Sequence, residues 1–288
     1  MKKSMTSILI LLMILGVENI FSQSASNPLR PGQKKNVIYF GPVAGYNRSF
    51  HTTDYKVTEP ENDAVACPSF TEGSNNGYFF GISGEYLIGN VKNSRSSIIG
   101  KIVYNTLPST LSQGGGDELS SSILDPTTGA PTVLKTSVDH SLDIEYNLIS
   151  TEIIYKFNFK GNFGVTVGPV IDLVMSSNNT QRMTIVGTDK EQAIFYDYTR
   201  RDDPDIIAAG ITFEDGGRTR VVDRNFGADI SNFRMGLKFG LQYTFYLQQL
   251  IVVPNFNYNF GLTNLSTVRD WRVSAIQVGV DVRWAFKY

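Results

Sequence analysis

Residues 274–288, SAIQVGVDVRWAFKY, decide the fold class of this chain. Successive side chains of a β-strand point to opposite faces, so apolar residues at every second position predict a strand with one apolar face. The intervening positions hold polar, charged or small residues, whereas a helix would mix the two sets on every face. The alternating apolar positions are Ile276, Val278, Val280, Val282, Trp284, Phe286 and Tyr288.

The same alternation recurs along most of the chain. Segment 141–157 changes phase near residues 148–150, which indicates either a bulge or a strand that passes from one environment into another. The predicted strands have roughly 11–17 residues. Each is therefore longer than a usual strand and long enough for a tilted crossing of a bilayer. Eight strands are predicted in all, over 37–50, 78–88, 97–107, 141–157, 163–173, 232–247, 250–262 and 274–288.

Two kinds of protein show such strands: a water-soluble sandwich or barrel, and a membrane barrel with lipid outside and a polar lumen. The polar faces here are rich in Gly, Asn and Thr, with sparse charges of both signs that can pair inside a lumen. A lipid-facing Arg or Lys at mid-bilayer would cost about 2–4 kcal/mol. We therefore expect a polar network in the lumen, made of Glu85, Lys101, Glu152, Asp172, Arg234, Lys238, Asp281 and Arg283.

The links between the predicted strands favour the membrane barrel. Long links (51–77, 108–140 and 174–231) alternate with short ones (89–96, 158–162 and 248–249), except that the last link on the long side, 263–273, is itself modest. Membrane barrels have short turns on the periplasmic side and long loops outside. Aromatic residues also gather at strand ends, as interfacial girdles do. The fold class expected is all-β, an eight-stranded antiparallel up-and-down transmembrane β-barrel with long extracellular loops and both termini periplasmic.

The N-terminal region has the pattern of an export signal. Lys2 and Lys3 precede an apolar run over 8–17 that is too short to span a bilayer, and small residues follow at 22–25. We predict a cleaved signal peptide at 1–23, a flexible periplasmic lead-in at 24–36 and an outer-membrane barrel domain at 37–288.

Composition excludes several classes of function. Among 288 residues, 26 Lys and Arg nearly balance 27 Asp and Glu, so no basic surplus favours nucleic acid as a partner. The single cysteine, Cys67, cannot form an internal disulfide, and no cofactor or metal site is predicted. His51 and His140, each near an aspartate (Asp54 and Asp139), are the candidates for a base in a loop-borne hydrolase.

The long loops contain further candidate features. Segments 113–117 and 125–131 are rich in turn residues, and hairpins are predicted over 212–222 and 184–198. The acidic run Asp202, Asp203 and Asp205 can be read as a divalent-cation ligand set or as a solvated charged loop, and the second reading is the simpler one. We expect the second and third loops to extend strands above the membrane.

Three stretches resemble the PorT-like outer-membrane β-barrel proteins of Bacteroidetes. They are 41–49 (GPVAGYNRS), 163–176 (FGVTVGPVIDLVMS) and 258–265 (YNFGLTNL). The chain departs from that family in its long third loop. Its terminal Trp284, Phe286 and Tyr288 resemble the C-terminal signal read by barrel-assembly machinery, although Phe is the commoner last residue. The resemblance implies location and fold but no catalytic residue.

The function expected is that of a non-enzymatic integral outer-membrane barrel with a surface-interaction or envelope-structural role and no large pore. Expected partners are outer-membrane lipid, lipopolysaccharide, barrel-assembly machinery during biogenesis and possible envelope proteins. Alternatives are an accessory barrel of a secretion or uptake machinery, such as type IX secretion, and a membrane-embedded hydrolase or acyltransferase. The lumen of eight strands is filled by side chains, which argues against a diffusion channel.

Overall fold

The computed structural model describes residues 37–56, 69–88, 94–114, 118–119, 123–124, 127–130, 135–187, 193–224, 230–247, 250–267 and 269–287. The predicted signal peptide, the lead-in and Tyr288 lie outside these residues. Among the described residues, no helix is long and apolar enough to cross a membrane.

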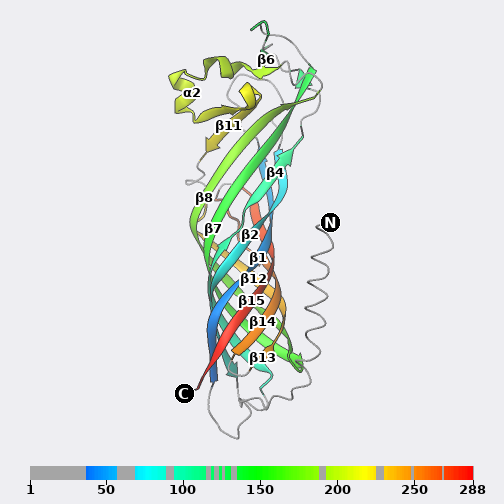
Figure 1. The fold of residues 1–288 in the computed structure, drawn as a ribbon, viewed down its shortest axis with the longest axis vertical. Coiled ribbons are helices and arrows are strands. Elements are labelled where there is room, and N and C mark those ends of the chain that lie inside the picture. Colours follow the sequence, from blue (N-terminus) through cyan, green and yellow to red (C-terminus); the bar gives the residue numbers. More distant parts are fainter. Residues whose placement is uncertain are drawn as a thin grey trace.

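The predicted fold class is confirmed: eight long antiparallel strands form a closed ring (Figure 1). Every pair of neighbours in the ring is antiparallel, and β15 pairs with β1 to close it. Several strands are longer than predicted because they continue above the barrel. The ring strands, in chain order, are β1 (Val37–Lys56), β2 (Ser69–Ile88), β3 (Ser96–Thr106), β7 (Lys135–Lys160), β8 (Phe163–Val186), β12 (Phe233–Tyr243), β14 (Leu250–Gly261) and β15 (Trp271–Lys287).

Shorter elements continue the ring or decorate its upper end (Figure 1). They are β4 (Ser109–Gln113), β5 (Glu118–Leu119), β6 (Ile123–Leu124), β9 (Ile194–Phe195), η2 (Tyr196–Arg200), α2 (Pro204–Ala208), β10 (Ile211–Glu214), η3 (Asp215–Gly217), β11 (Thr219–Arg224) and β13 (Phe245–Leu247). Above the barrel, β8 exchanges its neighbour β12 for β11, giving an open sheet in the order β4, β7, β8, β11, β10. We call this the upper sheet.

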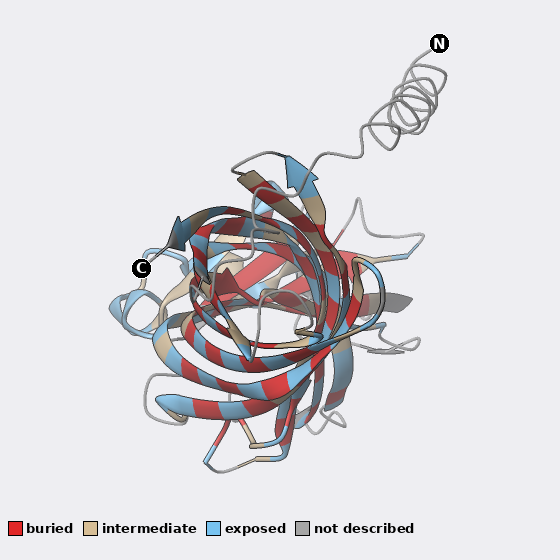
Figure 2. Ribbon diagram, turned by 90° about the horizontal axis from the view of Figure 1, so that it is seen from below, coloured by how far each residue is buried: buried red, intermediate tan, exposed pale blue. Residues whose placement is uncertain are grey.

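Side chains alternate between buried and exposed along the ring strands, as the period of two requires (Figure 2). In the lower part of the barrel, large apolar side chains point outward and are exposed. We call these outward residues the apolar band: Ile38, Phe40, Tyr46, Tyr78, Phe80, Ile82, Tyr86, Ile98, Ile102, Ile153, Tyr155, Phe157, Val165, Val167, Ile171, Leu173, Met175, Phe233, Met235, Phe239, Leu241, Phe256, Tyr258, Phe260, Val278, Val280, Trp284 and Phe286.

The apparent phase change in segment 141–157 has a chemical cause. The even-numbered residues of β7 are buried from Val138 to Lys156, so the backbone keeps its alternation. What changes is their chemistry: Leu142 and Leu148 in the upper part are apolar, whereas Glu152 and Lys156 lower down are charged. Of the two explanations in the sequence analysis, the passage between environments is therefore correct for β7.

A bulge does lie at the same height, but on the neighbouring strand. The register of β7 with β8 runs from Asn147 opposite Ser176 to Leu148 opposite Val174, so Met175 is the extra residue. In β8 the buried positions are even-numbered below Met175 and odd-numbered from Asn179 upward. The bulge lets one strand serve both the barrel wall and the upper sheet.

One of the two predicted loop hairpins is correct. Residues 212–222 form the β10–β11 hairpin around Asp215, which has a positive φ, and the two following glycines. The hairpin predicted over 184–198 is wrong, because β8 continues to Val186 and β9 pairs instead with the distant β6. A pairing between two separate loops leaves no periodic trace in the sequence.

Glycine makes room across the lumen where aromatic rings need it. A Cβ atom on Gly279 of β15 would lie 2.6 Å from Cζ of Phe79 and 2.8 Å from the carbonyl oxygen of Ala44. Phe79 is buried with Val43 and Val103. Its ring therefore occupies the space that a side chain at position 279 would need.

The substitution Gly279→Ala should destabilise the barrel by about 1–3 kcal/mol, since it overpacks a filled lumen. Replacing Phe79 with Leu in the same chain should recover part of that loss. Gly100→Ala is the matched control, because a Cβ there meets nothing within 4 Å. Denaturant unfolding in detergent micelles measures all three, and strict additivity of the Gly279→Ala and Phe79→Leu effects would contradict the packing argument.

Candidate functional site

The lumen inside the apolar band is lined by buried charges. Five cations face four anions, and each residue is less than 9% exposed. A charge in such a place must be paired and hydrogen-bonded, since the cost of removing it from water is several kcal/mol. These residues are Lys101, Lys156, Arg234, Lys238 and Arg283 with Glu85, Glu152, Asp172 and Asp281.

The largest charge cluster joins four strands near the lower end of the lumen. Glu85 of β2 accepts hydrogen bonds from Lys156 Nζ at 2.9 Å, from Ser97 Oγ at 2.5 Å and from Arg283 Nη1. Asp281 of β15 pairs with Lys101 Nζ at 3.1 Å and with Arg283 Nη2. Arg283 thus bridges the two carboxylates, and its fork-shaped guanidinium suits that role.

Two further ion pairs lie higher in the lumen. Lys238 Nζ of β12 pairs with Glu152 of β7, and Gly168 of the intervening β8 lies directly opposite Lys238 in the register. Arg234 pairs with Asp172, both fully buried, and donates a second hydrogen bond to the carbonyl oxygen of Val273 at 2.6 Å. Each pair links strands that are already neighbours or next neighbours in the ring.

Amide side chains fill the remaining space at middle height. Asn47 Nδ2 donates to Asn105 Oδ1 at 2.7 Å, and Asn257 Nδ2 donates to Asn255 Oδ1 at 2.8 Å. Asn255 in turn donates to Asp281 at 2.9 Å, which connects the amides to the charge cluster. The lumen is therefore filled by polar side chains, and the amides of Asn255 and Asn257 belong to the same network as the charge cluster.

Apolar clusters close the lumen at both ends. Below, Tyr39, Ile251 and Val253 pack together. Above, a larger cluster of buried apolar side chains lies under the upper sheet and resembles the core of a water-soluble protein. Its members are Phe70, Leu107, Leu111, Val138, Leu142, Ile144, Tyr146, Leu148, Met183, Ile230, Leu265, Trp271, Val273 and Ala275.

The structure places all eight residues of the predicted lumen network in the lumen, where each makes an ion pair. Lys156 joins them in the lumen although it was not among the predicted residues; it lies four residues after Glu152 on the same face of β7. Trp284 and Phe286 face outward at the lower rim and are exposed.

His51 is a structural residue of the upper lumen. Trp271 Nε1 donates to His51 Nδ1 at 3.2 Å, so His51 Nε2 carries the proton and donates to the carbonyl oxygen of Leu107 at 3.0 Å. The carbonyl oxygen of the next residue, Pro108, accepts from Ser49 Oγ. Pro108 separates β3 from β4, and these two side chains satisfy carbonyl groups at the break. Both ring nitrogens of His51 are engaged within the chain.

The remaining candidates for chemistry are spread apart. Asp203 accepts the backbone N–H of Asp205 at 3.1 Å as the N-cap of α2, and the hydrogen bond from Arg200 holds the pKa of its carboxyl below the usual range. Within the described part of the chain, no group of three or more His, Cys, Asp or Glu could hold a metal ion. Cys67 lies outside the described residues.

Comparisons with known proteins leave the family open. No protein-family model matches the chain. No curated protein matches it either. Among solved structures, it is similar to surface protein A of Neisseria (NspA; 12% identity, TM-score 0.32, 86% of this chain and 97% of that one). It is also similar to the attachment invasion locus protein Ail of Yersinia pestis (11%, 0.31, 85% and 98%) and to OprG of Pseudomonas aeruginosa (7%, 0.33, 89% and 99%). Similarities of this size assign neither a family nor an activity.

Glu152 and Lys238 should depend on each other: removing one charge should destabilise the barrel much more than removing both. Glu152→Gln leaves the buried Lys238 without its carboxylate partner and should cost about 3–5 kcal/mol of unfolding free energy. Glu152→Leu with Lys238→Met removes both charges and should recover most of that loss. The exposed Glu72→Gln is the control for loss of one carboxylate. Urea unfolding in micelles would contradict this account if the double variant were no more stable than Glu152→Gln.

His140 should make stability depend on pH. It lies in the upper part of β7, above the apolar band, where burial lowers the pKa of its imidazole although Asp139 opposes the shift. As pH falls through about 6.5, the unfolded chain binds a proton that the folded chain does not, so stability falls. His140→Gln should lose less unfolding free energy than the natural chain between pH 7 and pH 5. Equal losses in both chains would rule out His140 as the group responsible.

Proposed function

We propose that this protein is an integral outer-membrane β-barrel with no large pore and no enzymatic activity, acting in surface interaction or envelope structure. The observation that carries the proposal is the change of face chemistry along β7. In the lower barrel, charges point inward and apolar side chains outward, whereas the inward face is apolar in the upper part. Hydrocarbon around the lower part and water around the upper part account for both arrangements.

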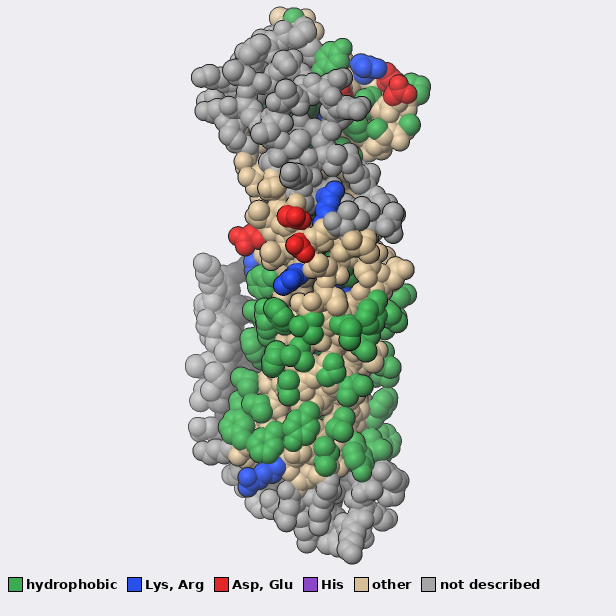
Figure 3. Space-filling view, turned by 180° about the vertical axis from the view of Figure 1, so that it is seen from behind, with side chains coloured by type: hydrophobic (Ala, Val, Ile, Leu, Met, Phe, Trp, Pro, Cys, Tyr) green, Lys and Arg blue, Asp and Glu red, His purple; other side chains and the backbone are tan. Residues whose placement is uncertain are grey.

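The outer surface supports this placement. Figure 3 shows hydrophobic side chains covering the lower barrel, while most visible charged side chains lie above them. Tyr46 is 77% exposed and would be poorly placed in water, but amphipathic aromatic side chains suit a membrane interface. Closure of the ring supports it too, because an open sheet edge would leave backbone groups unsatisfied in hydrocarbon.

We further propose that both termini face the periplasm and that the upper sheet lies outside the cell. The start of β1 and the end of β15 lie together, with Val37 opposite Lys287, at the end that carries the short turn at Gly161 and Asn162. Long links leave from the opposite end (Figure 1). Export by the signal at 1–23 and recognition of Trp284, Phe286 and Tyr288 by assembly machinery fit this orientation.

A second candidate is an accessory barrel of a secretion or uptake machinery, to which the resemblance to PorT-like proteins points. Exposed apolar side chains on the elements beside the upper sheet favour it: Ile207 of α2 is 62% exposed and Tyr196 of η2 is 43% exposed. Stoichiometric co-purification with envelope proteins, lost on Ile207→Ser, would distinguish this candidate from a solitary barrel.

Trypsin added to intact cells should cleave at the exposed Arg200 or Arg201 and leave Arg95, which is exposed at the opposite end of the barrel, uncut. Cleavage at Arg95 should require permeabilised cells. The Arg200→Gln/Arg201→Gln variant controls for the assignment of the fragment. The cleaved and intact barrels should fractionate with the outer membrane and migrate faster on gels before boiling. Cutting at Arg95 in intact cells would reverse the orientation, and recovery in the soluble fraction would refute the proposal.

A further inference from the structure

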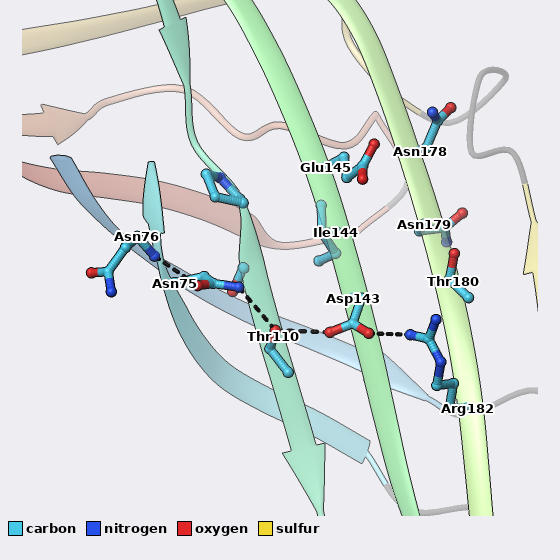
Figure 4. Close-up of a pocket in the computed structure, with 12 residues that line it drawn as sticks. Asn75, Asn76, Thr110, Asp143, Ile144, Glu145, Asn178, Asn179, Thr180 and Arg182 are labelled. Carbon is cyan, nitrogen blue, oxygen red and sulfur yellow. Dashed lines mark hydrogen bonds and ion pairs between the residues drawn. The ribbon is translucent and has the colours of Figure 1, made fainter. Parts of the chain in front are cut away.

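A polar groove of about 760 Å3 lies on the outer wall of the barrel above the apolar band (Figure 4). It forms beside Pro108, between β3 and β4, where β2 changes its hydrogen-bonding partner from one of these strands to the other. The pairing of β2 with β3 ends at Phe79, and its pairing with β4 begins at Ser74, so the residues between them leave the regular ladder. The volume falls in the range of about 300–1,000 Å3 typical of small-molecule sites.

A chain of hydrogen bonds fixes the floor of the groove across four strands (Figure 4). Asn75 Nδ2 of β2 donates to Thr110 Oγ1 of β4 at 3.2 Å, and Thr110 donates to Asp143 Oδ1 of β7 at 2.8 Å. Arg182 of β8 pairs with the other oxygen of Asp143. Side chains held from both sides in this way are oriented before any ligand arrives, which reduces the entropy cost of binding.

Other polar groups of the groove remain available. Glu145 and Asn178 are exposed and lie opposite each other on β7 and β8, and neither side chain makes a hydrogen bond within the described part of the chain. Ser109 and Asn179 also line the groove, but their side chains are buried, so Glu145 and Asn178 are the polar groups open to a ligand. The groove thus offers donors and acceptors that the protein itself does not use.

The height of the groove matches lipid headgroups. Along β2, the exposed Tyr78 of the band comes two residues after Asn76, and along β8 Met175 comes three residues before Asn178. Beneath the groove, Tyr78, Phe80 and Tyr104 form an aromatic group with ring centroids 5.3–6.5 Å apart. Aromatic side chains of this kind mark the boundary between hydrocarbon and headgroups.

We propose that the groove binds the sugar headgroup of a glycolipid in the surrounding leaflet, whose acyl chains lie against the aromatic group. The inference rests on the membrane placement proposed above. A carboxylate and an amide are suited to neighbouring hydroxyl groups, which can donate to Glu145 and both donate to and accept from Asn178. Asp143 and Glu145 against Arg182 leave one excess negative charge, which disfavours a phosphate as the recognised group.

The test titrates the detergent-purified barrel with three probes and measures binding by calorimetry. The probes are rough-form lipopolysaccharide carrying core sugars, the same lipid after phosphatase treatment, and phosphatidylglycerol. The two sugar-bearing probes should bind saturably and phosphatidylglycerol should not. Glu145→Ala/Asn178→Ala should weaken both sugar-bearing probes about tenfold, the order expected for lost hydrogen bonds that include a charged acceptor. Glu72→Ala, an exposed carboxylate on β2 outside the groove, should change nothing.

Three results would overturn the inference: unchanged affinity in the double variant, loss of binding after phosphatase treatment, or equal binding of phosphatidylglycerol. Fast gel migration before boiling checks that each variant has a closed barrel. If the natural chain migrates as a closed barrel, fractionates with the outer membrane and binds no probe, the groove proposal fails while the proposed function stands. If it fails to enter the outer membrane, both fail.

Discussion

The structure depends on the requirement that backbone polar groups in hydrocarbon find partners within the protein. A closed ring of antiparallel strands meets this requirement because every strand has two neighbours. Closure then gives each strand one side facing outward, toward lipid in the placement proposed above, and one facing a narrow interior. The exposed apolar side chains and the buried charges of the lower barrel are two consequences of the same geometry.

The interior shows why charges can persist where lipid would exclude them. Eight strands leave room for side chains but not for an aqueous channel, so each buried charge must find its partner among its neighbours. Arg283 does so by bridging Glu85 and Asp281, and Lys238 by reaching Glu152 past Gly168. Replacing such pairs with apolar residues need not destabilise a protein. We therefore expect these ion pairs to specify which strands come together and not to add stability.

Much of the barrel could be predicted from the sequence, because period-two alternation is a local property that strand geometry imposes directly. The lumen charges followed from the same parity. Three features could not be predicted: the extra residue at Met175, the β6–β9 pairing and the groove beside Pro108. Each depends on how distant segments meet. Lys156 is a different case, because it lies four residues after Glu152 and its position on the inward face follows from the same alternation.

The lower charge cluster has a consequence for the order of folding. Its hydrogen bonds join Ser83 and Lys101, near the beginning of the barrel, to Arg283 and Asp281, which are 200 and 180 residues later in the chain. These contacts cannot exist until the last strand has docked against the first. The cluster therefore forms late in folding. Separating β15 from β1 would expose several buried ions at once, so partial opening of the barrel between these two strands has a high free-energy cost.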